Sequence, residues 1–213
     1  MQDFHALIHR VEEKLKIAPP GEEYQLSMAP AHRKPVKEYL LEQNSYRLAA
    51  VMALLVPLRE HEPGVILIER SVYDGVHSGQ IALPGGKPEQ NETLEETAFR
   101  ELKEETGIKT HLPRLIGKLS PLYIPPSNFL VHPFVAALSE VPKFHPQERE
   151  VQRIFTMPLS ELHPSKVLRE KIKTSEGFVV DAPFFPLDNG NKIWGATAMI
   201  LSELFSAVQV SKD

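Results

Sequence analysis

The sequence predicts a mixed α/β sandwich. Three features indicate this class: short apolar runs that suit buried strands, amphipathic segments near both ends of the chain, and a strongly helical segment between the strands. Strands that alternate with a small number of helices favour helices layered on a sheet over a helical bundle. With 213 residues, of which 42% are hydrophobic, the chain is able to bury a core of this kind.

The N-terminal part of the chain predicts helices joined by a loop. Residues 2–16 carry apolar side chains at helical spacing, which indicates an amphipathic first helix. Residues 17–35 are rich in proline and predict a loop or linker, and a short helix is expected at residues 36–42. We therefore expect an N-terminal helix and linker over residues 1–35 and one main domain over residues 36–213.

Apolar runs in the middle of the chain predict the central strands. The run from Leu48 to Val56 predicts a buried strand, although its alanines and leucines leave a helix as the alternative. Residues 64–69 predict the partner strand across a turn. Two further strands are expected at residues 115–119 and 129–138, with a proline-containing turn between them.

The C-terminal part predicts strands and a closing helix. Residues 150–162 suggest a strand and then a short helix that starts near Pro158. Residues 178–185 suggest another strand. Residues 194–208 carry an apolar stripe at helical spacing and predict the final helix.

Composition and charge exclude several classes of protein. The chain has no cysteine, which excludes disulfides, thiolate metal sites and a cysteine nucleophile. A net charge of -4 argues against nucleic acid as a partner. The N-terminus carries acidic residues and does not resemble a signal peptide, and the longest apolar run is far shorter than the ~20 residues of a membrane span. We therefore expect a cytoplasmic protein with no membrane partner.

Acidic residues gather on one predicted helix. Residues 93–106 predict a helix that ends at Gly107. At about 100° per residue, Glu105 lies about 40° from Glu101 on the helical wheel, and Glu104 lies about 60° away on the other side. These three carboxylates border the apolar stripe that should face the core, whereas a purely solvated acidic face would lie opposite it. That stripe consists of Leu94, Ala98 and Leu102.

A bound cation explains this cluster better than a solvated acidic face, which remains the alternative. Like charges four residues apart cost an isolated helix about 0.2–0.5 kcal/mol per pair, and a position next to the core adds a desolvation penalty. Oxygen ligands suit a hard ion such as Mg²⁺ or Mn²⁺. Arg100 is spaced to pair with Glu104, and Gly85-Gly86 allows the backbone to pass close to the site and offer a carbonyl.

The spacing of these residues resembles the Nudix box. The matching positions are Gly86, Glu92, Arg100-Glu101-Leu102, Glu104-Glu105 and Gly107-Ile108. The resemblance implies a Nudix-like α/β/α sandwich with a mixed central sheet, and a Nudix hydrolase domain over residues 36–213. It also implies that Glu101 and Glu105 are the principal metal ligands. Glu104 and the Gly86 carbonyl are then further ligands, and Arg100 and Glu92 support the loop and the helix.

Segments on both sides of the box resemble the coenzyme A pyrophosphatase branch of the family. The shared residues are Arg70-Ser71, His77, Gly79-Gln80, Pro84-Gly85-Gly86, residues 126–129 and residues 193–198. The resemblance implies hydrolysis of coenzyme A or acyl-coenzyme A to adenosine 3′,5′-bisphosphate and 4′-phosphopantetheine. This chain departs from the branch at Leu83, where the branch has Phe. It also departs at Asp74-Gly75, where the branch has Leu and a basic residue.

Eight residues are predicted to bind the substrate, and six of them have a structural alternative. Arg70 would contact phosphate or form a surface ion pair, Tyr73 would stack on a base or pack, and His77 would bind phosphate or serve as a structural hydrogen-bonding group. The segment Ser127-Asn128-Phe129 would form a substrate loop or an ordinary turn, and Trp194 is expected in the core. The predicted set is Arg70, Tyr73, His77, Ser78, Gln80, Ser127, Asn128 and Phe129.

Two other functions remain open at this point. The substrate would be another nucleoside diphosphate derivative such as ADP-ribose, or the domain would bind a nucleotide without cleaving it. In each case the expected partner is a small nucleotide-type molecule. The N-terminal helix is free to pack on its own domain or on a second subunit, so a homodimer is also open.

Overall fold

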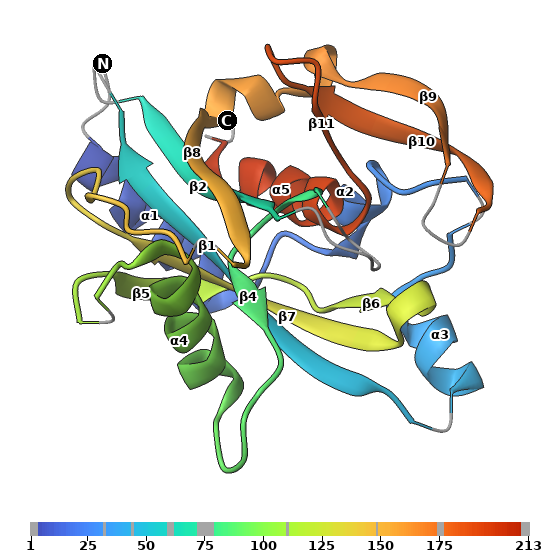
Figure 1. Ribbon diagram of the computed structural model, residues 1–213, viewed down its shortest axis with the longest axis horizontal. Coiled ribbons are helices and arrows are strands. Elements are labelled where there is room, and N and C mark those ends of the chain that lie inside the picture. Colours follow the sequence, from blue (N-terminus) through green and yellow to red (C-terminus); the bar gives the residue numbers. More distant parts are fainter. Residues whose placement is uncertain are drawn as a thin grey trace.

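The structure is a computed structural model, and it confirms the predicted sandwich: a mixed sheet lies between helices on both of its faces (Figure 1). Within the described residues, no helix combines the length and the apolar character needed to cross a bilayer. The described residues are 4–31, 33–43, 45–58, 62–71, 79–109, 111–147, 149–173 and 177–209.

Strand β1 (Arg47–Pro57) lies in the middle of the sheet. The run from Leu48 to Val56 is therefore a strand, as predicted, and the alternative of a helix is wrong. Its side chains alternate between two buried cores: Ala53 and Leu55 face one of them, and Met52 and Leu54 face the other. Because both faces of β1 are covered, its sequence is continuously apolar instead of alternating with polar residues.

The described part of the sheet has eight strands of mixed direction. Strand β1 runs parallel to β7 and antiparallel to β2, while β5 and β6 pair antiparallel with β7. The strands besides β1 are β2 (Pro63–Arg70), β3 (Ile81–Ala82), β4 (Gly85–Gly86), β5 (Arg114–Lys118), β6 (Leu122–Ile124), β7 (Phe129–Ala137) and β8 (Val151–Pro158).

The short strand β4 lies where β1 and β2 diverge. Strand β2 pairs with one end of β1, at Leu55 to Pro57, and then with β3 farther along its length. Strand β4 pairs instead with Ala50 and Val51 of β1, and the Met52 N–H donates to the Pro84 carbonyl at 2.8 Å. The double glycine is therefore held against the centre of the sheet.

Three helices provide the outer layers. Helix α4 (Leu94–Thr106) packs on one face of β1, and α1 (Phe4–Ile17) and α5 (Gly195–Val208) bury their apolar sides on the other. Helix α4 starts with a capping box between Thr93 and Glu96 and ends at Gly107, whose φ of 76° is left-handed. These helices match the sequence predictions, and α1 packs on its own domain.

The segment predicted as a loop at residues 17–35 contains a helix, so that prediction was wrong in part. Helix α2 (Glu22–Leu26) is only five residues long and is stabilised by tertiary contacts. Its Gln25 side chain is buried and donates to Glu203 of α5 at 2.7 Å. The expected short helix is confirmed as α3 (Val36–Glu42), and the domain boundary at residue 35 stays a prediction.

A second sheet of three strands packs beside α5. It consists of β9 (Leu168–Lys173), β10 (Val179–Pro186) and β11 (Lys192–Trp194), of which the sequence indicated β10 alone. The remaining described elements are 3₁₀ helices. They are η2 (Pro125–Ser127), η3 (Leu159–Leu162), which confirms the predicted turn of helix after Pro158, and η4 (Pro164–Lys166).

Candidate active site

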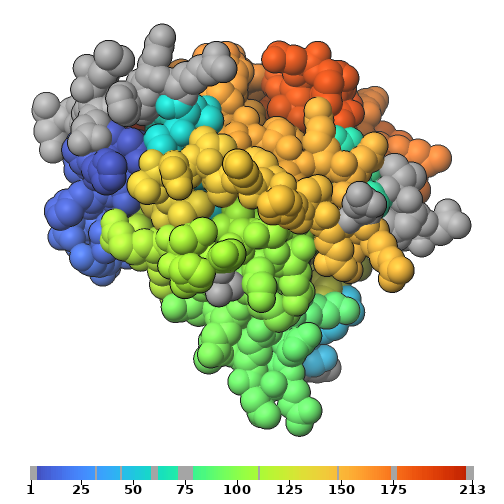
Figure 2. Space-filling view, turned by 60° about the vertical axis from the view of Figure 1, so that its left-hand side comes forward, coloured from blue at the N-terminus to red at the C-terminus, as the bar shows by residue number. Residues whose placement is uncertain are grey.

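The carboxylates of α4 enter the protein to different depths. The Glu105 side chain is 1% exposed, the Glu101 side chain 15% and the Glu104 side chain 46%. Glu105 lies on the buried stripe of the helix, so a purely solvated acidic face is ruled out at this position. Helix α4 and the loop before it project from the rest of the molecule (Figure 2, green).

Glu105 is a buried carboxylate with little compensation for its charge. It accepts a hydrogen bond of 2.9 Å from the Gly85 N–H, and the Arg70 guanidinium lies 3.8 Å away. Burial raises the pKa of Glu105 to about 7, against the opposing effects of Arg70 and the Gly85 N–H. The charges of Glu101 and Glu150 raise the pKa further, so this carboxylate is short of a positive partner.

Arg100 connects the loop before α4 to the helix through all five of its N–H donors. Its Nε and Nη2 atoms donate to Glu92 at 2.8 and 3.0 Å, a bidentate arrangement. Its Nη1 atom donates to Glu101 at 2.9 Å and to Glu104 at 3.0 Å. The remaining Nη2 donor binds the Lys87 carbonyl at 2.9 Å, so one side chain fixes three carboxylates and the loop backbone.

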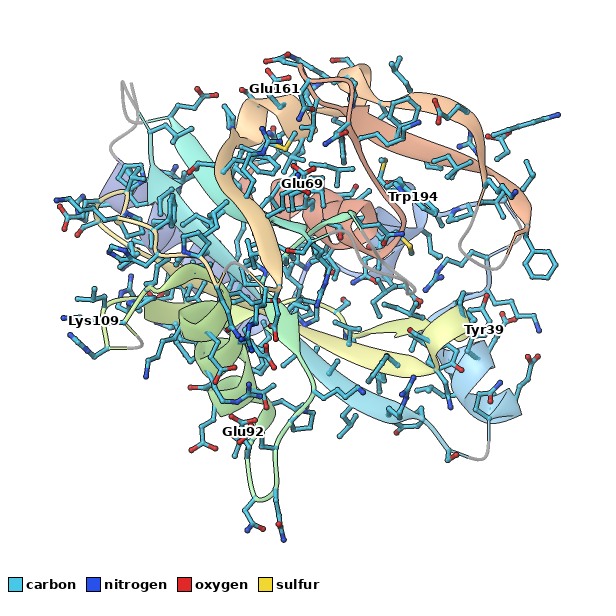
Figure 3. All side chains as sticks on the ribbon, viewed as in Figure 1. Tyr39, Glu69, Glu92, Lys109, Glu161 and Trp194 are labelled. Atoms are coloured by element: carbon cyan, nitrogen blue, oxygen red, sulfur yellow. The ribbon has the colours of Figure 1, made fainter. Side chains whose placement is uncertain are left out.

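Glu92 lies at the N-terminal end of α4 (Figure 3) and holds the loop in place. Besides Arg100, it accepts from the Glu89 N–H and from the Thr97 hydroxyl, each at 2.9 Å. The hydrogen bonds from Arg100 are the largest cause that lowers the pKa of Glu92 to about 2. Glu92 therefore stays ionised in a structural role, as its position in the box implies.

The double glycine allows the backbone to approach the carboxylates. A Cβ atom on Gly86 would overlap the carboxylate of Glu101, and one on Gly85 would overlap the Ala50 carbonyl oxygen. Glu101 therefore packs directly on the loop backbone, where any larger residue at position 86 would displace it.

Burial raises the pKa of Glu101, while the hydrogen bond and the charge of Arg100 act in the opposite direction.

These residues fit a hard divalent cation. The inner pair, Glu101 and Glu105, offers carboxylate oxygens beside a backbone turn, and burial opposes ionisation of both members. No group of three acidic or histidine side chains converges as a ready metal site among the residues described. In the structure Arg100 donates to Glu101 and Glu104, while Glu105 accepts from the Gly85 N–H.

Glu150 is a residue near the site that the sequence did not single out. Its charge acts on both Glu101 and Glu105. It lies just before β8, where its carbonyl accepts from the Ser71 N–H at 2.9 Å, next to the end of β2. Only the pairing of β8 with β2 brings this distant glutamate to the box, so no local pattern pointed to it.

Arg70 and Gln80 line a cavity of about 330 Å³ that reaches Gly85. Its other walls come from β3, from the start of α5 and from the segment after α2, and they are mainly apolar. Trp194, expected in the core, is partly buried and lines this cavity near the start of α5 (Figure 3). The predicted residues Tyr73, His77 and Ser78 lie outside the described residues.

The predicted substrate loop is tied to its own neighbours. The Asn128 side chain accepts from the Tyr123 hydroxyl at 2.9 Å and donates to the Ser45 carbonyl at 3.2 Å. The Arg47 guanidinium lies 4.1 Å from the centre of the Phe129 ring, and it donates to the Ser127 carbonyl. These contacts suit an ordinary turn, and a role of the three residues in substrate binding stays a prediction.

Comparisons with known proteins agree with this architecture. A NUDIX domain model matches residues 47–178. The Nudix hydrolase NudL of Yersinia enterocolitica is 35% identical over 161 residues, which cover 74% of this chain and 81% of the relative. The NudL of Photorhabdus laumondii is 29% identical over 188 residues, covering 88% and 95%.

A solved structure supports the fold. The crystal structure of a MutT/nudix family protein from Enterococcus faecalis has a TM-score of 0.53 at 18% identity, covering 87% of this chain and 73% of that one. This likeness concerns the fold, whereas the family rests on the matched domain and the sequence relatives. The chain belongs to the Nudix family and is a Nudix pyrophosphohydrolase.

Proposed function

We propose that the protein hydrolyses the diphosphate of coenzyme A or an acyl-coenzyme A, giving adenosine 3′,5′-bisphosphate and 4′-phosphopantetheine. The observation that carries the proposal is the position of the inner pair. Glu105 contacts Gly85, and Gly85 lines the cavity that also contains Arg70 and Gln80. A diphosphate at this end of the cavity would lie beside the carboxylates and an arginine. The flanking segments that resemble the coenzyme A branch supply the choice of substrate.

Each residue of the box has a separate task in this proposal. Glu101, Glu104, Glu105 and the Gly86 carbonyl would hold Mg²⁺ or Mn²⁺, which neutralises phosphate charge and makes bound water nucleophilic. Arg100 and Glu92 keep the loop and the helix in register through their bidentate pair. Arg70 lines the cavity and would bind the diphosphate from that side.

Glu150 is our candidate for the proton acceptor. Its side chain is exposed, and no described ion pair engages it. It nevertheless acts electrostatically on both members of the inner pair. A carboxylate in this position can receive the proton of the attacking water without giving up a structural contact.

An assay on a substrate panel tests the proposal. Coenzyme A, acetyl-coenzyme A and ADP-ribose are each incubated with Mg²⁺ or Mn²⁺, and the products are separated by chromatography. We expect coenzyme A to give the bisphosphate and phosphopantetheine, and Glu105→Gln to lose at least about 100-fold in kcat/KM. Glu95→Gln, an exposed change on the same helix, is the matched control and should keep wild-type activity.

The panel also separates the alternatives. Preferred cleavage of ADP-ribose would replace the substrate while keeping the reaction. Nucleotide binding without turnover would favour a non-catalytic module, although every box carboxylate is present in this chain. Wild-type turnover in Glu105→Gln would contradict the assigned role of the inner pair. The cytoplasmic location and the homodimer stay predictions from the sequence.

A further inference from the structure

Arg33 lines the same cavity as Arg70, although it comes from the N-terminal segment far from the Nudix box. Two contacts hold that segment in place. The Ala31 N–H donates to the Asp181 carbonyl on β10 at 3.3 Å, and the Arg33 Nη2 atom donates to the Tyr123 carbonyl on β6. The Arg33 side chain is therefore held against β6 and forms part of the cavity wall.

The guanidinium of Arg33 is short of negative charge. Burial lowers the pKa of Arg33 from its usual value, although Tyr39 and Glu22 act in the opposite direction. Glu22 makes no ion pair with Arg33 among the described residues, and its carboxylate accepts instead from the Val36 N–H at 2.5 Å. The Tyr39 ring lies 5.8 Å from the guanidinium. A guanidinium has five N–H donors, and the described contacts of Arg33 satisfy one of them.

The cavity thus has two arginines in mainly apolar walls. Arg70 lies at the end of the cavity next to Glu105, where it would bind the diphosphate that is hydrolysed. Arg33 contacts β6 and α3 instead, away from the box. A second anionic group on the substrate would satisfy its remaining donors. The planar fork of arginine matches a phosphate through two parallel hydrogen bonds.

We propose that Arg33 binds a phosphate monoester of the substrate, separate from the diphosphate that is hydrolysed. The inference rests on the proposed function, in which that group is the 3′-phosphate of coenzyme A. Here the N-terminal segment supplies a positive charge to the cavity.

Kinetics on a matched substrate pair test the assignment. Coenzyme A and dephospho-coenzyme A differ only in the 3′-phosphate. We expect Arg33→Gln to raise KM for coenzyme A by about 10- to 100-fold with little change in kcat, and to leave dephospho-coenzyme A unaffected. Lys34→Gln is the control, because Lys34 is exposed and pairs with Glu42 at 2.5 Å. An unchanged preference in Arg33→Gln would overturn the proposal.

A binding measurement keeps the two proposals distinguishable. Calorimetry compares adenosine 3′,5′-bisphosphate with AMP on the wild-type protein and on Arg33→Gln, without any turnover. We expect the wild type to bind the bisphosphate more tightly and the variant to bind both alike. Equal affinities in the wild type would overturn the role of Arg33 even if Arg33→Gln does not fold. A wild type that prefers the bisphosphate but does not cleave coenzyme A would refute the proposed function alone.

Discussion

The backbone N–H of Gly85 donates a 2.9 Å hydrogen bond to the carboxylate of Glu105, which joins the glycine turn to the buried side of α4. One neutral donor is poor compensation for a buried negative charge, and Arg70 remains 3.8 Å away. This hydrogen bond therefore positions the carboxylate but leaves its negative charge with little electrostatic compensation.

The free energy of unfolding of the metal-free protein should fall as the pH rises from about 4.5 to 7. Glu105 has a pKa of about 7 in the folded state, against 4.5 for an ordinary glutamate, so the folded state holds the proton more tightly. Its contribution to stability is present below pH 4.5 and is lost as the pH passes 7. Glu105→Gln should be more stable than wild type by about 3 kcal/mol at pH 8, and equal to it near pH 4. Urea denaturation in EDTA measures this difference, and a gap that is independent of pH would contradict the explanation.

Divalent cations should reverse this effect. Mg²⁺ or Mn²⁺ at pH 8 should raise the melting temperature of the wild type, since a ligand at 100 times its Kd stabilises the folded state by about 2.7 kcal/mol. Glu105→Gln should show little or no shift, whereas Glu95→Gln should shift like the wild type. Differential scanning fluorimetry over a metal titration provides the measurement, and equal shifts in all three proteins would place the ion elsewhere.

Arg100→Lys should weaken both the fold and the activity. Lysine has three donors on one nitrogen, so it cannot hold Glu92 in a bidentate pair while reaching Glu101, Glu104 and the Lys87 carbonyl. We expect a loss of about 2 kcal/mol in unfolding free energy. A double-mutant cycle with Glu92→Gln should give a coupling energy of about 1–3 kcal/mol. Strictly additive effects would show that the observed contacts contribute nothing.

Gly86→Ala should displace the Glu101 carboxylate. The added methyl group overlaps that side chain, so turnover should fall at least about tenfold and stability by about 1–3 kcal/mol. In a Glu101→Asp background the shorter side chain leaves room for the methyl group, so the stability cost of Gly86→Ala should be smaller. Denaturation of the four proteins in this cycle decides the point. If Gly86→Ala lowers stability by the same amount in both backgrounds, the loss comes from the backbone and not from overlap with the Glu101 side chain.

Glu203→Leu should detach α2 from α5. The buried carboxylate accepts from the Gly21 N–H, the Gln25 side chain and both donors of Ser120. Leucine would remove this acceptor from all of them, and Gln25 would keep only its 2.7 Å hydrogen bond to the Ser120 carbonyl. We expect a loss of about 3 kcal/mol or more, with hydrogen exchange rising first in α2. Ser202→Ala, which removes an exposed contact to Ser27, is the control and should cost far less.

Strong local signals made part of the fold predictable. Helix α4 combines a capping box, an apolar stripe and a left-handed glycine, and each signal acts within a few residues of the chain. Strand β9 carries the sequence LREKIK, in which charged residues outnumber apolar ones. The sequence therefore shows no periodic apolar pattern that would predict its pairing with β10. Helix α2 is too short to form without Gln25 anchored at Glu203.

The residues of the candidate site also differ in whether local sequence signals predict them. The box residues were predictable because one helix and one glycine turn bring them together. Glu150 and Arg33 were not, since strand pairing carries the first to the box and the contacts of the N-terminal segment carry the second to the cavity. Residues that meet only through tertiary packing leave no spacing in the sequence by which to recognise them.

The cavity takes its walls from segments that lie far from α4 in the chain: the stretch after α2, the hairpin strand β10 and the first turn of α5. Changes in those segments leave the Arg100 network untouched. Substitutions in those segments are therefore able to reshape the cavity without altering the contacts between Arg100 and the carboxylates of the box.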